Sequence, residues 1–199
     1  RQATAAFEFT AYTRALTDFC NNDLSAFFFD IRKDALYCDV GPALPGGTTK
    51  RRAYRTVLDT LFHALVRYAA PILCFTAEEV WTTRFPDAGS VHLLEWPEVD
   101  AGWSDDDLRM RWERLRDIRA EATATIEPLR REKVIGSSLE ADLDIIAYDP
   151  GDRTLLDSVD FAEIAIAGAI AVSAGEAELQ DAGAAVAIEA RKTEYEKCG

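Results

Sequence analysis

Hydrophobic residues recur every three or four positions through most of the first two-thirds of the chain, which is the spacing of one helix face. This pattern predicts helices over residues 2–21, 23–37, 48–70 and 105–132. The polar triplet Asn21-Asn22-Asp23 predicts a short break between the first two, with Asp23 capping the second helix through its side-chain oxygen. Pro71 interrupts the third helix, because proline lacks the backbone N–H that the hydrogen-bond ladder needs.

Other residues predict where elements begin and end in the rest of the chain. Thr76 and Glu79 have the spacing of a capping box, which predicts a short helix starting there. Proline and glycine residues predict irregular structure over 41–47 and 85–106, and Pro128 predicts that the last long helix bends or ends early. Further along, the predicted strands are 143–148, 164–173 and 184–190, and the predicted short helix is 152–159. Alanine and glycine are poor strand formers, and they dominate the last two strands.

The pattern also indicates which side chains are buried. We expect Trp81 in the core, and His63 in or beside it, because the chain has only one other histidine to share a metal site. The four cysteines match no metal-binding or CxxC spacing, so we expect a reduced, cytosolic protein with Cys20 and Cys74 as small core residues. The arginines of 109–119 alternate with acids, which is typical of a solvated helix face.

Charge is distributed unevenly. A net charge of −13 argues against a generally basic nucleic-acid binder, but residues 140–189 hold twelve acids and one base and carry −11 of it. The rest carries only −2 and includes the basic clusters Lys50-Arg51-Arg52 and Arg130-Arg131-Lys133, so one face can meet phosphates. The first cluster begins a helix, where cations oppose the helix dipole. We interpret it first as a plain solvated cluster, with a phosphate-facing role as the alternative.

Four segments resemble the isoleucyl-tRNA synthetase family, in the same order along the chain. LSAFFFDIRKDALY (24–37) and RREKVIGSSLEADLDIIAY (130–148) resemble its anticodon-binding region and the junction that follows. APILCFTAEEVW (70–81) resembles a segment shared with the valyl, leucyl and methionyl enzymes. SVHLLEWP (90–97) resembles a further segment of the same family. The similarity runs from about Phe19 to about Ala147. Phe28-Phe29 stands where a tyrosine is usual, and Ala35 where an arginine is usual; if that arginine holds tRNA, this chain uses another group.

The resemblance implies a mainly α fold: a helical anticodon-binding bundle over 1–137, followed by a small α+β domain over 138–199. It implies recognition of a tRNA anticodon stem-loop within an enzyme that ligates isoleucine to its tRNA using ATP with Mg²⁺. The HIGH and KMSKS motifs of the catalytic domain do not occur in these residues, so this part is not expected to be catalytic or to hold a cofactor itself. The chain begins without Met and stops at Cys198-Gly199, so we expect a piece of a longer protein.

The same family implies a monomeric, cytoplasmic enzyme whose partners are tRNA and its own other domains. No apolar run approaches the roughly 20 residues of a membrane helix, so no membrane partner is expected. The ending EYEKCG resembles the start of a cysteine-ligated zinc module found in bacterial members. Cys198 is a zinc ligand only if further cysteines follow it, because structural zinc needs about four ligands.

Polar and aromatic residues of the matching segments and basic clusters are the candidate tRNA contacts. They are Lys33, Asp34, Tyr37, Arg51, Arg52, Arg130 and Lys133. Asp34 can accept from a base amino group or pair with a nearby basic residue. Two alternatives stay open: an acidic helical module that orients domains without reading RNA, and the equivalent bundle of a sister valyl or leucyl synthetase.

Overall fold

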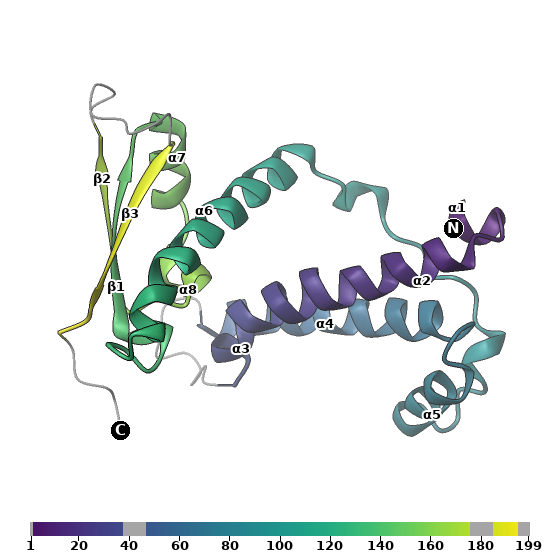
Figure 1. Cartoon of the computed structure of the whole chain (residues 1–199). Coiled ribbons are helices and arrows are strands. Elements are labelled where there is room, and N and C mark those ends of the chain that lie inside the picture. Colours follow the sequence, from purple (N-terminus) through teal and green to yellow (C-terminus); the bar gives the residue numbers. More distant parts are fainter. Residues whose placement is uncertain (1, 38–46, 176–184, 195–199) are drawn as a thin grey trace. The chain divides into compact units, whose positions relative to one another are not determined.

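The computed structural model describes residues 2–37, 47–175 and 185–194. Packing divides the chain into two units, residues 1–103 and 104–199, and each is described by itself. The first unit is helical, and the second combines helices with a three-stranded sheet (Figure 1). This confirms the mainly α class with a small α+β region toward the C-terminus. The domain boundary that the sequence predicts, between residues 137 and 138, stays a prediction. In the described part of the chain, no helix is long and apolar enough to cross a membrane.

One continuous helical run, residues 9–37, makes up most of the first part of the first unit. After the short helix α1 (Gln2–Ala5), the α-helix α2 (Phe9–Asp18) passes into a π-helix, η1 (Phe19–Phe29), and then into α3 (Asp30–Tyr37). The predicted break at residues 21–23 is therefore wrong, and Asp23 lies inside the run rather than capping a helix. Asparagine and aspartate are poor helix formers, but Leu24 is buried here, and packing of an apolar face outweighs local propensity.

The second half of this unit packs around one tryptophan. Helix α4 (Gly47–Ala69) ends just before Pro71, as predicted, and is followed by α5 (Cys74–Arg84) and the 3₁₀ turns η2 (Val91–Leu93) and η3 (Ala101–Trp103). Trp81 is buried with Val66 and Val91 and donates from Nε1 to the Gly89 carbonyl at 3.1 Å, which confirms its core role. His63 is half-buried against the Phe85 and Trp81 rings, as expected of a boundary histidine.

Two predictions for α5 are wrong. The helix begins at Cys74, and its N-cap, Leu73, makes no side-chain capping bond, so Thr76 and Glu79 form no capping box. The neighbouring carboxylate Glu78 instead accepts from the Ser90 hydroxyl and the Val91 N–H, both at 2.9 Å, and so ties the irregular segment to α5. Cys74 is exposed rather than in the core, because it sits on the first turn after Pro71.

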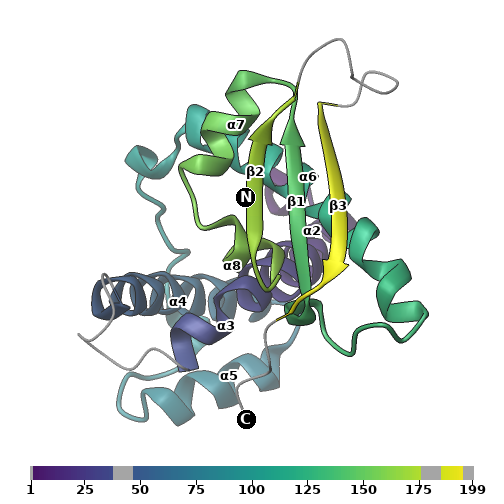
Figure 2. The ribbon, with the colours of Figure 1, turned by 90° about the vertical axis from the view of Figure 1, so that its left-hand side faces the viewer.

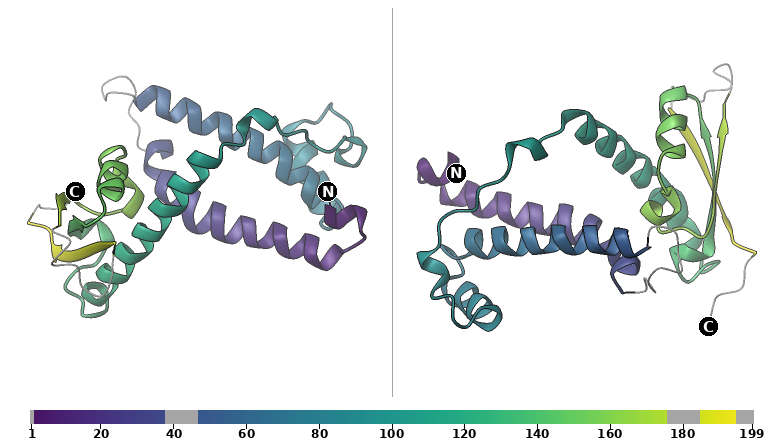
Figure 3. Two further views of the ribbon diagram at one scale, coloured as in Figure 1. Left: turned by 90° about the horizontal axis from the view of Figure 1, so that it is seen from above. Right: turned by 180° about the vertical axis from the view of Figure 1, so that it is seen from behind.

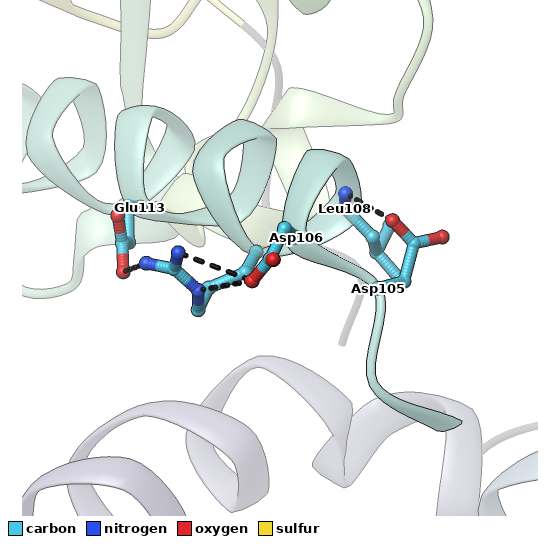
Figure 4. A network of polar contacts seen from close by, with 5 residues as sticks. Asp105, Asp106, Leu108 and Glu113 are labelled. Atoms are coloured by element: carbon cyan, nitrogen blue, oxygen red, sulfur yellow. Dashed lines mark hydrogen bonds and ion pairs between the residues drawn. The ribbon is translucent and has the colours of Figure 1, made fainter. Parts of the chain in front are cut away.

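Helix α6 (Asp106–Arg131) begins the regular structure of the second unit. Asp105 caps it by accepting from the Leu108 N–H at 2.8 Å, and Asp106 and Glu113 both bind the Arg109 guanidinium (Figure 4). Acids in the first turn also suit the positive end of the helix dipole. Pro128 lies inside the helix and does not end it early. Its ring is exposed, and only the last turn follows, so little of the hydrogen-bond ladder is lost.

The sheet of the second unit has the order β2-β1-β3 (Figure 2). Its strands are β1 (Ala141–Ala147), β2 (Ile170–Ala174) and β3 (Val186–Lys192), with β2 parallel and β3 antiparallel to β1. The 3₁₀ turn η4 (Ser138–Glu140) leads into β1, and α7 (Pro150–Asp157) and α8 (Phe161–Ala165) connect β1 to β2. The predicted strand 164–173 is wrong in its first half, because Ile164 and Ala165 belong to α8. Ile166, which follows as the C-cap, has a left-handed conformation (φ 55°).

The core of this unit lies between α6 and the sheet. Four α6 side chains at helical spacing are buried: Leu115, Ile118, Ala122 and Ile126. They join Leu143 and Ile145 of β1, together with Leu156 of α7 and Phe161 of α8, in one cluster. Because α6 buries its apolar stripe against this sheet, the division by packing falls before α6 rather than after it.

Two α6 arginines are structural rather than part of a solvated face. Arg114 makes a two-pronged contact with Asp152 of α7, at 2.8 and 2.6 Å, and Arg119 donates to the Ile164 carbonyl of α8 at 2.8 Å. The hydrogen bond to Asp152 raises the pKa of Arg114 above its ordinary value. Asp152 is buried, so its charge needs this partner.

We expect Arg114→Ala to lower the free energy of unfolding of the second unit by about 3 kcal/mol, because it leaves the buried Asp152 carboxylate without its partner. Urea titration followed by circular dichroism measures this. The control is Arg109→Ala, which removes two exposed ion pairs on the same helix and should destabilise the unit much less. Equal effects of the two substitutions would contradict the assignment.

Tyr12 links α2 to α4 and gives the first unit an alkaline pH dependence. Its hydroxyl donates to the Tyr68 carbonyl, and burial together with Tyr68 raises its pKa above the ordinary 10.0. The folded state therefore keeps this proton longer than the unfolded state, so stability is full below the unfolded pKa and falls as pH rises through the folded pKa. Unfolding titrations at stepwise higher pH measure the fall. Tyr12→Phe should remove this component while costing about 1 kcal/mol near neutral pH for the lost hydrogen bond.

Candidate nucleic-acid interface

Helices α3 and α4 place most of the candidate contacts at one end of the first unit. Tyr12 of α2 contacts Tyr68 near the end of α4, whereas Phe28 and Arg32 contact Tyr54 near its start. The helical run 9–37 therefore lies antiparallel to α4, and the end of α3 lies beside the beginning of α4. Figures 1 and 3 show this pairing from three directions.

The beginning of α4 is strongly cationic. Arg51, Arg52 and Arg55 are exposed, Lys50 is half-buried, and no acid occurs between residues 47 and 58. The helix dipole adds partial positive charge at a helix N-terminus, where these four cations lie. These cations repel one another and attract anions, and phosphate groups are among the anions that arginine binds with paired hydrogen bonds.

The outer side of α3 adds a cation, an acid and an aromatic ring to this end. Lys33 pairs with Asp30 at 3.4 Å, and Asp34 and Tyr37 are exposed, Tyr37 to 84%. Arg32 instead lies over the Tyr54 ring, 4.7 Å from its centre, and holds α3 against α4. The structure thus brings five predicted contacts together at what we call the basic end: Lys33, Asp34, Tyr37, Arg51 and Arg52.

The two remaining candidates lie in the second unit, at the end of α6. Arg130 is exposed and pairs with Glu127 at 3.3 Å, and Lys133 follows the helix with a left-handed backbone (φ 60°). They form a separate basic region of that unit. The roles of all seven residues in binding RNA stay predictions.

Arg55 belongs to the basic end but was not among the predicted contacts. It is exposed on α4. Its spacing of four residues from Arg51, which places both on one side of the helix, is the sequence signal for it.

In the part of the chain that the structure describes, no three histidine, cysteine or acidic side chains gather into a metal site. Cys198 lies outside the described residues.

A helical domain with a concentrated basic end has the charge that suits a protein that binds an RNA backbone. Comparison with known proteins agrees: residues 1–146 match the family described as the anticodon-binding domain of tRNA ligase. The chain therefore belongs to this family. It is 59% identical over 198 residues to an isoleucine–tRNA ligase of Zymomonas mobilis, and 46% identical over 203 residues to one of Agrobacterium fabrum. In both comparisons all of this chain is covered but only 20% of the relative, so it spans about a fifth of their length.

We expect Tyr54→Leu to loosen α3 without changing the charge of the basic end. The substitution removes the ring that Phe28 packs against at 6.4 Å and that Arg32 covers. Amide hydrogen exchange in residues 30–37 should accelerate by about fivefold or more, equivalent to about 1 kcal/mol of lost packing. Exchange in residues 61–69 serves as the internal control and should stay unchanged. Uniform acceleration in both segments would mean that Tyr54 stabilises the whole unit instead.

Proposed function

We propose that this chain is the part of an isoleucine–tRNA ligase that holds the anticodon stem-loop of isoleucine tRNA. The observation that carries the proposal is the basic end, where exposed arginines at the start of α4 lie beside the end of α3. The family and the named activity of the relatives at 59% and 46% identity support it. They also favour the isoleucine enzyme over a sister synthetase and over an acidic module without RNA.

In this proposal, phosphate and base contacts divide between the two helices. Arg51 and Arg52 bind phosphates of the stem-loop, because guanidinium groups match phosphate oxygens with paired hydrogen bonds. Lys33, Asp34 and Tyr37 face the loop, whose unpaired bases can be splayed out, stacked on rings and read along their edges. Arg130 and Lys133 of the second unit supply further backbone contacts.

The proposal extends to the longer enzyme that the relatives represent. That enzyme joins isoleucine to its tRNA with ATP and Mg²⁺ bound in domains outside these residues, and acts as a cytoplasmic monomer. The partners of this chain are then tRNA and the other domains of the ligase. A zinc module beyond Cys198 is part of the same proposal and requires further cysteines after it.

The test is the salt dependence of RNA binding by the double variant Arg51→Ala/Arg52→Ala. Isoleucine tRNA is titrated against wild type and variant at several salt concentrations, with an anticodon-swapped tRNA as the specificity control. We expect weaker binding and a plot of log affinity against log salt that is shallower by about one unit per lost phosphate contact. Selective binding of isoleucine tRNA by wild type would support anticodon reading.

A charge-matched control separates local contact from general electrostatics. Arg109→Ala/Arg153→Ala makes the same change in net charge, but both side chains are exposed and pair within their own helices, with Glu113 and Asp157. It should leave affinity and salt slope close to wild type. The proposed phosphate contacts are excluded if Arg51→Ala/Arg52→Ala behaves like this control.

A further inference from the structure

Three outward-facing side chains on α3 and the residue before it form a row that we call the loop row: Phe29, Lys33 and Tyr37. They are four residues apart, so they are neighbours on one side of the helix. All three are exposed: the Phe29 residue to 41%, the Lys33 side chain to 52% and the Tyr37 residue to 84%. The order is aromatic, cationic, aromatic.

Packing against α4 determines the direction of this row. Phe28 and Arg32, each one residue before a member of the row, contact Tyr54. The next in that series, Leu36, is half-buried. Successive residues of an α-helix are about 100° apart, so holding Phe28 and Arg32 against α4 turns Phe29 and Lys33 away from it. The loop row is therefore held outward by the same contacts that assemble the basic end.

Exposed aromatic rings interleaved with cations suit unpaired nucleic acid. Bases stack on such rings whatever their identity, while the cations follow the backbone. We propose that the loop row binds unpaired bases of an RNA loop, with Phe29 and Tyr37 as separate stacking platforms and Lys33 contacting the phosphate between them. The inference rests on the proposed function and assigns Phe29 a role that neither its sequence pattern nor the family match indicates.

The spacing of the two rings specifies which RNA structure fits. Eight residues of helix separate them by about 12 Å along the axis. Neighbouring layers in a stack are only about 3.4 Å apart, so a single base cannot stack on both rings. They suit two bases splayed away from each other, which a loop provides and a paired stem does not. The Lys33–Asp30 pair is solvent-exposed and therefore weak, so a phosphate can replace Asp30.

The charge around the row favours RNA over an apolar protein partner. The row shares its end of the unit with Arg51, Arg52 and Arg55 of α4. An apolar protein surface would have to desolvate these cations without compensating them, whereas the RNA backbone pairs with them.

The experiment measures binding of two RNA probes to the full chain. One probe is the isolated anticodon stem-loop hairpin of isoleucine tRNA, and the other is an uninterrupted duplex with the same number of phosphates. We expect Phe29→Ala and Tyr37→Ala each to weaken hairpin binding by about fivefold or more, with the salt slope and duplex binding unchanged. Phe29→Tyr and Tyr37→Phe keep a ring and should bind the hairpin like wild type.

Phe19→Ala is the matched control, because Phe19 is an equally large ring in the same helical run, 37% exposed, and lies outside the row. Circular dichroism verifies that each variant is folded. Hairpin affinities within twofold of the control for both alanine variants would overturn the loop row. Equal weakening of hairpin and duplex would also overturn base stacking.

The experiments can reject this inference without rejecting the proposed function. A flattened salt slope in Arg51→Ala/Arg52→Ala, with no effect of the ring variants, would retain the phosphate contacts and reject the loop row alone. Absence of hairpin binding by wild type at low salt would reject both.

Discussion

The first unit depends on the antiparallel packing of one continuous helical run, residues 9–37, against α4. That run begins in α-helical form, passes through the eleven-residue π-helix η1 and returns to α-helical form as α3. The run contacts Tyr68 and Tyr54, which lie near the two ends of α4. Without this pairing, the beginning of α4 and the end of α3 would not lie together at one end of the unit. The basic residues of each helix would then be ordinary surface charges.

The π-helix is the least expected part of this arrangement. In the first part of the run, residues 9–22, only Tyr12, Leu16 and Cys20 are not exposed, and the series of partly or fully buried residues continues in steps of four through Leu24 to Leu36. An α-helix has 3.6 residues per turn, so such a series would wind around it by about 40° at each step. The wider turns of a π-helix wind in the opposite sense and compensate. One side of the run can therefore stay against α4 along its length.

Local charge explains how an acidic chain presents a basic end. The net charge of −13 is concentrated in residues 140–189, whereas the start of α4 has four cations and no acid over residues 47–58. Charges farther apart than a Debye length, about 8 Å at physiological salt, are largely screened from each other. A phosphate within that distance of the start of α4 is attracted by its four cations, and no acid of residues 47–58 opposes them. In the second unit, some acids are structural, since Asp105 and Asp149 cap helices and Asp152 pairs with Arg114.

The sequence by itself determined the long helices, the end of α4 before Pro71, the strand β1 and the membership of the family. These features depend on local spacing and on motifs that survive without knowledge of the fold. It also identified five residues of the basic end. Only the tertiary structure decided that these five lie together while Arg130 and Lys133 belong to another unit, because that grouping depends on contacts between residues distant in the chain. Tertiary packing likewise overrode the polar triplet at residues 21–23, the capping box at Thr76 and the expected solvation of Arg114, since burial of apolar faces and pairing of buried charge outweigh local preferences.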